Sequence, residues 1–127
     1  MPVSFDLSAR DSVLDPYDSS DDRPVFVRVR VGQKPRYRVH IYLEGPSLPY
    51  VERVTYILHP SFRNRERVRQ RSMTNPNAKL TIWTWGVFSL QAWVEDRWGA
   101  VYEFHYSLTY GQEVRRLMEQ GVRFEKV

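Results

Sequence analysis

Residues 37–44 decide the fold class, because they read Tyr-Arg-Val-His-Ile-Tyr-Leu-Glu and place an apolar or aromatic side chain at every second position from Tyr37 to Leu43. Successive side chains of a β-strand point to opposite faces of a sheet, so a period of two predicts a strand. Glycine and proline bound the run, in residues 32–35 before it and residues 45–49 after it. A strand over residues 37–44 is therefore the starting point of the fold prediction.

The same alternation continues on both sides of this strand. Val25, Val27, Val29 and Val31 share one parity, and Gly86 and the turn-like residues 96–99 separate later alternating runs. The turn at 96–99 predicts a hairpin. The predicted strands cover residues 25–31, 37–44, 51–59, 80–85, 87–94 and 101–108, with weaker edge strands at 3–7 and 122–127. The runs 80–85 and 87–94 are either two strands or one strand kinked at Gly86.

One segment has helical spacing instead. Val114, Leu117 and Met118 fall on one stripe of residues 112–120, and Gly121 is typical of a helix C-terminus. Short, regularly spaced strands with turns between them favour an all-β, antiparallel β-sandwich with one short C-terminal helix. Residues 11–24 are rich in Asp, Ser and Pro, and we expect an acidic loop or mobile arm there.

Length and composition limit the class of protein. The chain has 127 residues, so we expect one domain over residues 1–127. It has no cysteine, which excludes disulfides, thiolate metal sites and cysteine nucleophiles. No apolar run approaches a membrane span, and the first residues lack a signal-peptide pattern. We expect a soluble protein with no membrane partner, cytoplasmic, or nuclear if the source is eukaryotic.

Two short motifs carry the functional prediction. The first is Leu58-His59-Pro60-Ser61-Phe62, and the second is Thr84-Trp85-Gly86-Val87-Phe88. The first resembles the Leu-His-(Pro or Glu)-Ser/Thr-Phe segment of the YEATS family, and the second resembles that family's Gly-Trp/Tyr-Gly-x-Phe segment. Residues 42–45 and 51–54 also look like segments of the family, so the resemblance spans residues 25–108 and points to a prokaryotic-type YEATS domain. It implies an immunoglobulin-like sandwich.

The resemblance also implies a ligand and a site. YEATS domains bind acylated lysine between two aromatic rings, and the corresponding rings here would be Phe62 and Trp85. Ser61 would hydrogen-bond the acyl amide and His59 would brace its hydroxyl. The backbone N–H of Trp85 would meet the acyl carbonyl, with Gly86 allowing close approach. With the neighbouring Trp83, the predicted ligand-binding set is His59, Ser61, Phe62, Trp83, Trp85 and Gly86.

The chemistry of this set suits a neutral ligand. Acylation removes the charge of lysine, so a site needs apolar walls, a donor and an acceptor, and it needs no carboxylate. The predicted partner is an acylated lysine on a protein or peptide, or a related small acyl ligand, without a cofactor. His40, His59 and His105 lack metal-ligand spacing, so no metal is expected. No residue is visibly positioned to orient His59 as a base for Ser61, and we expect no enzyme.

Two other hypotheses stay open. Five arginines alternate with other residues and would point to one side of an extended chain; they are Arg63, Arg65, Arg67, Arg69 and Arg71. They indicate either a surface for nucleic acid or another polyanion, or an edge strand protected by charge. The third hypothesis is a sensor or adaptor with a changed ligand, because Thr84, Ser107 and residues 35–37 depart from the family pattern. Taken singly, each candidate residue is also typical of a structural residue that only packs in the core or a loop. This holds for Phe62, Trp83, Trp85, Phe88 and His59.

Overall fold

The computed structural model describes residues 5–15, 26–27, 36–84 and 86–119. They form two antiparallel sheets and one α-helix. The chain divides into two compact units. One comprises residues 1–10, 42–80 and 88–107, and the other comprises residues 11–41, 81–87 and 108–127.

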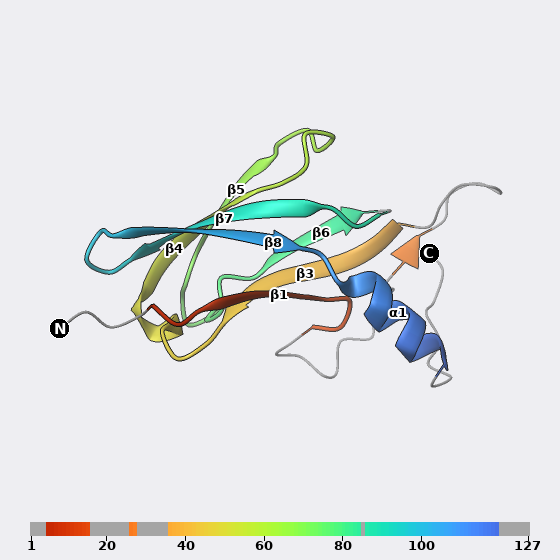
Figure 1. The fold of residues 1–127 in the computed structure, drawn as a ribbon, viewed down its shortest axis with the longest axis horizontal. Coiled ribbons are helices and arrows are strands. Elements are labelled where there is room, and N and C mark those ends of the chain that lie inside the picture. The colour runs from red at the N-terminus through yellow and green to blue at the C-terminus, as the bar shows by residue number, and fades with distance from the viewer. Residues whose placement is uncertain (1–4, 16–25, 28–35, 85, 120–127) are drawn as a thin grey trace. The chain divides into compact units, whose positions relative to one another are not determined.

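The first unit contains a complete four-stranded sheet. Its strands are β4 (Val51–Ile57), β5 (Glu66–Gln70), β7 (Ser89–Asp96) and β8 (Val101–Ser107). They run antiparallel in the order β5-β4-β7-β8, and Figure 1 shows them side by side. Among the described strands, β5 pairs with β4 alone and lies at the edge of the sheet.

A register shift in β4 explains a break in its alternation. Val51 pairs with Asp96 of β7 and Arg53 pairs with Glu95, so one residue of β4 lies between adjacent pairs. An extra residue in one strand of an antiparallel pair is a β-bulge, and it changes which side chains face inward. Val51 and Val54 are consequently both buried, although a strict period of two would place them on opposite faces.

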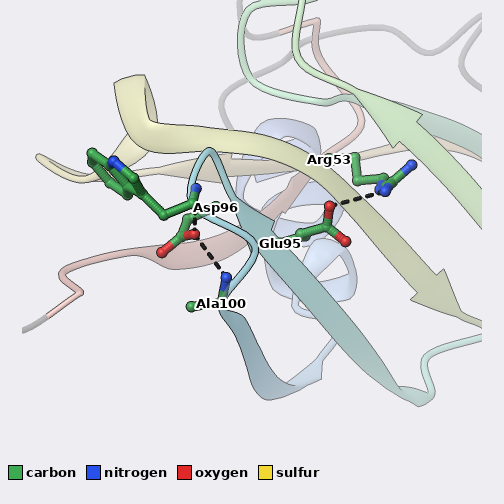
Figure 2. Close-up of polar contacts among 5 residues, drawn as sticks. Arg53, Glu95, Asp96 and Ala100 are labelled. Atoms are coloured by element: carbon green, nitrogen blue, oxygen red, sulfur yellow. Dashed lines mark hydrogen bonds and ion pairs between the residues drawn. The ribbon is translucent and has the colours of Figure 1, made fainter.

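The turn between β7 and β8 is fixed by one buried carboxylate. Oδ1 of Asp96 accepts hydrogen bonds of 2.9 Å from the backbone N–H groups of both Trp98 and Ala100, and Figure 2 shows the contact with Ala100. Its Oδ2 accepts a third bond from the Tyr102 hydroxyl at 3.1 Å. Gly99 has a φ of +88°, which favours glycine. The turn presents Trp98 with 72% of its surface exposed.

The other sheet consists of β1 (Ser8–Ser12), β2 (Phe26–Val27), β3 (Arg36–Glu44) and β6 (Leu80–Thr84). Its strands follow the order β1-β3-β2, and β6 also pairs with β3. A 3-10 turn, η1 (Leu48–Tyr50), precedes β4. The strand β3 is buried on both faces, including His40, whose Nδ1 lies 2.8 Å from the Thr81 hydroxyl.

Mostly aliphatic side chains form the core of each unit. In the first unit the buried apolar residues are Leu7, Leu43, Val51, Val54, Tyr56, Leu58, Ala78, Leu80, Leu90, Ala92 and Val94. In the second they are Val13, Val39, Ile41, Ile82, Leu108, Tyr110, Val114 and Leu117. Burial raises the pKa of Tyr56 well above its ordinary value, and the Tyr56 hydroxyl donates to the Ala78 carbonyl at 2.8 Å.

The helix α1 (Tyr110–Glu119) begins on a side-chain cap from β1. The Asp11 carboxylate accepts the backbone N–H groups of Thr109, at 2.9 Å, and Tyr110, at 2.7 Å, and also the Thr109 hydroxyl at 2.8 Å. Glu113 in the first turn binds the Val13 N–H at 2.6 Å. Burial, with Tyr37 and Asp11 nearby, raises the pKa of Tyr110 to about 12. No helix in the described part of the chain has the length and apolar character to cross a membrane.

Most of the predicted elements are present. The strands predicted over 37–44, 51–59, 80–85, 87–94 and 101–108 correspond to β3, β4, β6, β7 and β8, and the helix over 112–120 corresponds to α1. Val114 and Leu117 are buried as the helical stripe predicts. Of the strand predicted over 25–31, Phe26 and Val27 form β2, and the other positions lie outside the described residues.

The N-terminal prediction was wrong where it is described. Residues 5–7 are not in a strand, and the strand occurs later, as β1. Asp11 and Ser12, which we expected in a loop, belong to β1 and are buried. Their hydrogen bonds to α1 and its preceding residue compensate the cost of burying polar groups, which composition alone does not register. Residues 16–24 of the predicted arm and the predicted strand over 122–127 lie outside the described residues.

Candidate functional site

The first predicted motif forms a hydrogen-bonded pair just after β4. Nδ1 of His59 lies 2.8 Å from Oγ of Ser61, and the Ser61 backbone N–H donates to the same nitrogen at 3.1 Å. A backbone N–H can only donate, so Nδ1 accepts and the neutral ring carries its proton on Nε2. The Ser61 hydroxyl then also donates to Nδ1. Both residues are exposed, so the lone pairs of the Ser61 oxygen can accept a hydrogen bond from a ligand.

Aromatic rings pack beside this pair. The Phe88 ring lies 5.4 Å from the Phe62 ring and 6.0 Å from the His59 ring, measured between centroids, with the planes inclined at 54° and 60°. Inclined rings at these separations have favourable edge-to-face contacts. His59, Ser61, Phe62 and Phe88 therefore form one cluster, which we call the His-Ser-Phe cluster.

Phe88 was not among the predicted site residues, although it closes the second motif. It contacts two residues of the first motif and thus joins the segment before β7 to the segment after β4. The signal that could have identified it is its place at the end of the Gly-x-Phe pattern. Its distance along the chain from Phe62 gave no indication of contact.

The second motif is described in part. Trp85 lies outside the described residues, and with it the predicted pairing of Phe62 with Trp85. Trp83 in β6 is 42% exposed. The Thr84 hydroxyl donates to the Gly86 carbonyl at 3.1 Å and accepts the Gly86 N–H at 3.5 Å. A Cβ added at Gly86 would meet no atom within 4 Å.

A groove of about 240 Å³ opens next to the His-Ser-Phe cluster and shares His59 with it. It lies where β4 ends and β7 begins. Its lining residues are Ile57, Leu58, His59, Pro60, Arg65, Ser89, Leu90, Gln91 and His105.

The five predicted arginines lie along and beside the edge strand β5. Arg67 and Arg69 are within the strand, and the other three flank it. Arg65 donates to the Leu58 carbonyl at 3.1 Å, Arg69 to the Val68 carbonyl at 2.8 Å, and Arg67 to the Asn64 carbonyl. Arg71 binds the Val51 and Pro49 carbonyls at 3.3 and 3.0 Å. Within the described residues, none of the five pairs with a carboxylate, so their positive charge is not neutralised locally.

A metal site or a catalytic site needs several ligating or titratable side chains close together. Over the described ranges, no group of three or more His, Cys, Asp or Glu side chains is positioned to hold a metal ion. His105 has a carboxylate partner, Glu103, at 3.0 Å, and both residues are exposed. His59 contacts Ser61 and Phe88, and among the described residues no carboxylate orients its ring.

The chain is similar to proteins of known structure. It matches the sequence profile of the prokaryotic YEATS domain over residues 37–124. The Yaf9 YEATS domain recognising an H3K122suc peptide aligns with a TM-score of 0.51 at 17% identity, covering 85% of this chain and 77% of that one. The Yaf9 YEATS domain bound to H3K27ac gives 0.48 at 15% identity, with 86% and 77% covered. No curated protein matches the sequence. The first alignment confirms the predicted immunoglobulin-like antiparallel β-sandwich.

Proposed function

This chain belongs to the prokaryotic YEATS domain family, and from that premise we propose that it is a non-catalytic module that binds an acylated lysine or a related acyl amide. The Yaf9 YEATS domain, which has a similar fold, recognises an H3K122suc peptide. We propose the same kind of partner for this chain.

The hydrogen bond between His59 and Ser61 carries the proposal. An acyl-lysine amide presents one N–H donor and one carbonyl acceptor at the end of an apolar stem. The Ser61 oxygen, with its own proton directed to His59, accepts the amide N–H. The ring of Phe62 beside it supplies apolar surface for the stem and the acyl group.

The charge of the site fits a neutral lysine derivative better than free lysine. None of the four residues of the His-Ser-Phe cluster is acidic. A free ammonium group would lose hydration there without gaining a counter-ion, which costs free energy. Acylation removes this cost, so we expect the site to discriminate acylated from unmodified lysine.

A peptide titration tests the proposal. Acetylated, crotonylated and unmodified forms of one lysine peptide are titrated while tryptophan fluorescence and isothermal heat are recorded. We expect the acylated forms to bind at least tenfold more tightly. Equal affinity for acylated and unmodified peptide would contradict an acyl-lysine reader and would favour a sensor or adaptor with a changed ligand.

Variants locate the site. Ser61→Ala removes the acceptor for the amide N–H, and the loss of one neutral hydrogen bond predicts about three- to tenfold weaker binding. Phe62→Ala removes an apolar wall and should weaken binding at least as much. Ser8→Ala, at an exposed serine of β1 outside the cluster, is the control and should bind as wild type.

The un-neutralised arginines favour a second candidate function. Along β5, five guanidinium groups have no carboxylate partner among the described residues, and they would attract a polyanion such as single- or double-stranded nucleic acid. Such binding depends on counterion release, so the affinity should fall steeply with added salt. Undetectable binding of DNA and RNA at low ionic strength would exclude this function and leave edge protection as the role of the arginines.

A further inference from the structure

The groove beside the His-Ser-Phe cluster has the chemistry of an anion site. None of the described residues that line it is acidic. Its lining includes the permanently charged Arg65 and the neutral donors Ser89 and Gln91, together with His59 and His105, and His105 already contacts the Glu103 carboxylate at 3.0 Å. Ile57, Leu58 and Leu90 add apolar surface to the lining. A carboxylate with a short apolar stem would match both parts of this lining.

Arg65 is held in a defined position at the groove. Its Nε donates to the Leu58 carbonyl at 3.1 Å, which fixes one edge of the guanidinium. The Arg65 carbonyl in turn accepts the Leu58 N–H at 2.7 Å, so backbone and side chain are both anchored to the end of β4. The two terminal nitrogens have no carboxylate partner within the described residues. A planar guanidinium in this state is suited to bidentate contact with a carboxylate.

His59 joins the groove to the proposed acyl-amide site. Its ring lines the groove, and its Nδ1 bonds the Ser61 hydroxyl at 2.8 Å. A peptide in an extended conformation advances about 3.3 Å per residue. A residue within three positions of a lysine bound at Ser61 can therefore reach the groove.

We propose that this groove binds the carboxylate side chain of an Asp or Glu close to the acylated lysine, so that the domain selects acylated lysines in an acidic sequence. This inference rests on the proposed function. The volume of about 240 Å³ suits one side chain, since pockets for whole small-molecule ligands are usually about 300–1,000 Å³. Contact between Arg65 and the carboxylate makes the domain selective for acidic sequences. The hydrogen bond to Ser61 recognises the acyl-lysine amide.

The test uses acetyl-lysine peptides in a neutral host sequence. Glutamate is placed at each of the three positions on either side of the lysine, one at a time, and each peptide is compared with its glutamine counterpart. We expect one or two positions at which glutamate binds about two- to fivefold more tightly, as for a partly exposed ion pair. The preference should shrink as salt is raised.

Arg65→Gln should reduce the ratio of glutamate to glutamine affinity to about one, with the affinity for the glutamine peptide unchanged. Arg67→Gln removes the same charge from β5 without altering the groove lining, and it should keep the preference. Arg65→Lys keeps the charge and should retain part of it. Circular dichroism and thermal unfolding of each variant show whether the fold is retained.

The outcomes separate the two proposals. Binding that requires acylation but shows no glutamate preference, or a preference that survives Arg65→Gln in a folded variant, overturns the groove inference alone. Binding that does not require acylation overturns the proposed function and this inference with it. A succinyl-lysine peptide without acidic residues provides a further arm. If Arg65→Gln weakens binding of the succinyl peptide more than binding of the acetyl peptide, the groove binds the carboxylate of the acyl group. The assignment of the groove to an Asp or Glu side chain of the peptide is then wrong.

Discussion

Asp11 is a single residue on which the start of α1 depends. Its carboxylate accepts the N–H groups of Thr109 and Tyr110, which the helix itself cannot satisfy. It is a negative charge at the positive end of the helix dipole, and it is 8% exposed. The cap therefore combines hydrogen bonds with a favourable charge. Because Asp11 is buried, water does not easily take over its hydrogen bonds to the helix.

Replacing this residue should have a large effect on stability. Asp11→Ala leaves buried N–H groups without an acceptor, and we expect the free energy of unfolding to fall by about 2 kcal/mol. Denaturant titration followed by circular dichroism measures the change. Asp6→Ala, at an exposed aspartate, is the control and should stay within about 0.5 kcal/mol of wild type. An equal effect of both substitutions would show that Asp11 does not cap the helix.

The sequence predicted the contact between His59 and Ser61 but not the cap at Asp11. Residues two apart after a strand are close whatever the rest of the chain does, so the motif alone identified the pair. Asp11 meets Thr109 across a sequence separation of 98 residues, and its own neighbours are the polar residues typical of a loop. Phe88 was missed for the same reason, since its contact with Phe62 depends on how β4 and β7 pair.

At the scale of elements, two turns depend on glycine to different degrees. Gly45, after β3, has a φ of +139°, and a Cβ there would lie 2.7 Å from the backbone oxygen of Asp6. Gly99, in the turn after β7, has a φ of +88°, and a Cβ would meet nothing within 4 Å. The first position therefore combines backbone strain with a steric clash, and the second has backbone strain alone.

Alanine substitutions should reveal this difference. We expect Gly99→Ala to lower the free energy of unfolding by about 1–2 kcal/mol from the left-handed backbone. Gly45→Ala should cost more, because the backbone at Asp6 must also move. Thermal unfolding of the two variants beside wild type measures both effects. A smaller loss for Gly45→Ala than for Gly99→Ala would contradict the clash.

The edge strand β5 offers a second test at this scale. Exposed edges can pair with other chains, and charged side chains oppose this. The double substitution Arg67→Thr with Arg69→Thr should raise the proportion of aggregated protein on light scattering at high concentration. The same change at Arg115 and Arg116, two exposed arginines of α1, removes equal charge away from the edge. Similar aggregation of both double variants would attribute the effect to net charge.

Predicting elements from sequence succeeded where burial follows a regular period. Leu90, Ala92 and Val94 alternate in β7 with less buried residues and are themselves buried, so their pattern was sufficient. The strand β1 has the sequence Ser-Ala-Arg-Asp-Ser, which has no such pattern. It becomes a strand through pairing with β3, and a pairing between distant segments leaves no mark on local periodicity.

For the whole molecule, the buried tyrosines predict a limit to stability at high pH. The ordinary tyrosine pKa is 10.0, and burial raises that of Tyr110 to about 12 and that of Tyr56 further. Below pH 10 the folded and unfolded states both hold these protons. Above it the unfolded state loses them first, so the free energy of unfolding should fall as the pH rises from 10 toward 12.

Denaturant titrations at intervals from pH 9 to pH 12 measure this decline. Each tyrosine that keeps its proton only in the folded state contributes a slope of up to about 1.4 kcal/mol per pH unit. Tyr56→Phe should be less stable at pH 9, because the bond to the Ala78 carbonyl is lost, but its stability should decline less steeply. An unchanged slope in this variant would show that Tyr56 does not contribute to the alkaline transition.

The rigid turn at Asp96 has an optical consequence. It holds the indole of Trp98 in contact with solvent, with the Tyr50 ring 5.5 Å away. A chromophore that is already hydrated in the native protein emits at long wavelength and contributes a constant background to any fluorescence experiment. Replacing Trp98 with phenylalanine would remove this background, leaving the emission of the other indoles to report on ligands more clearly.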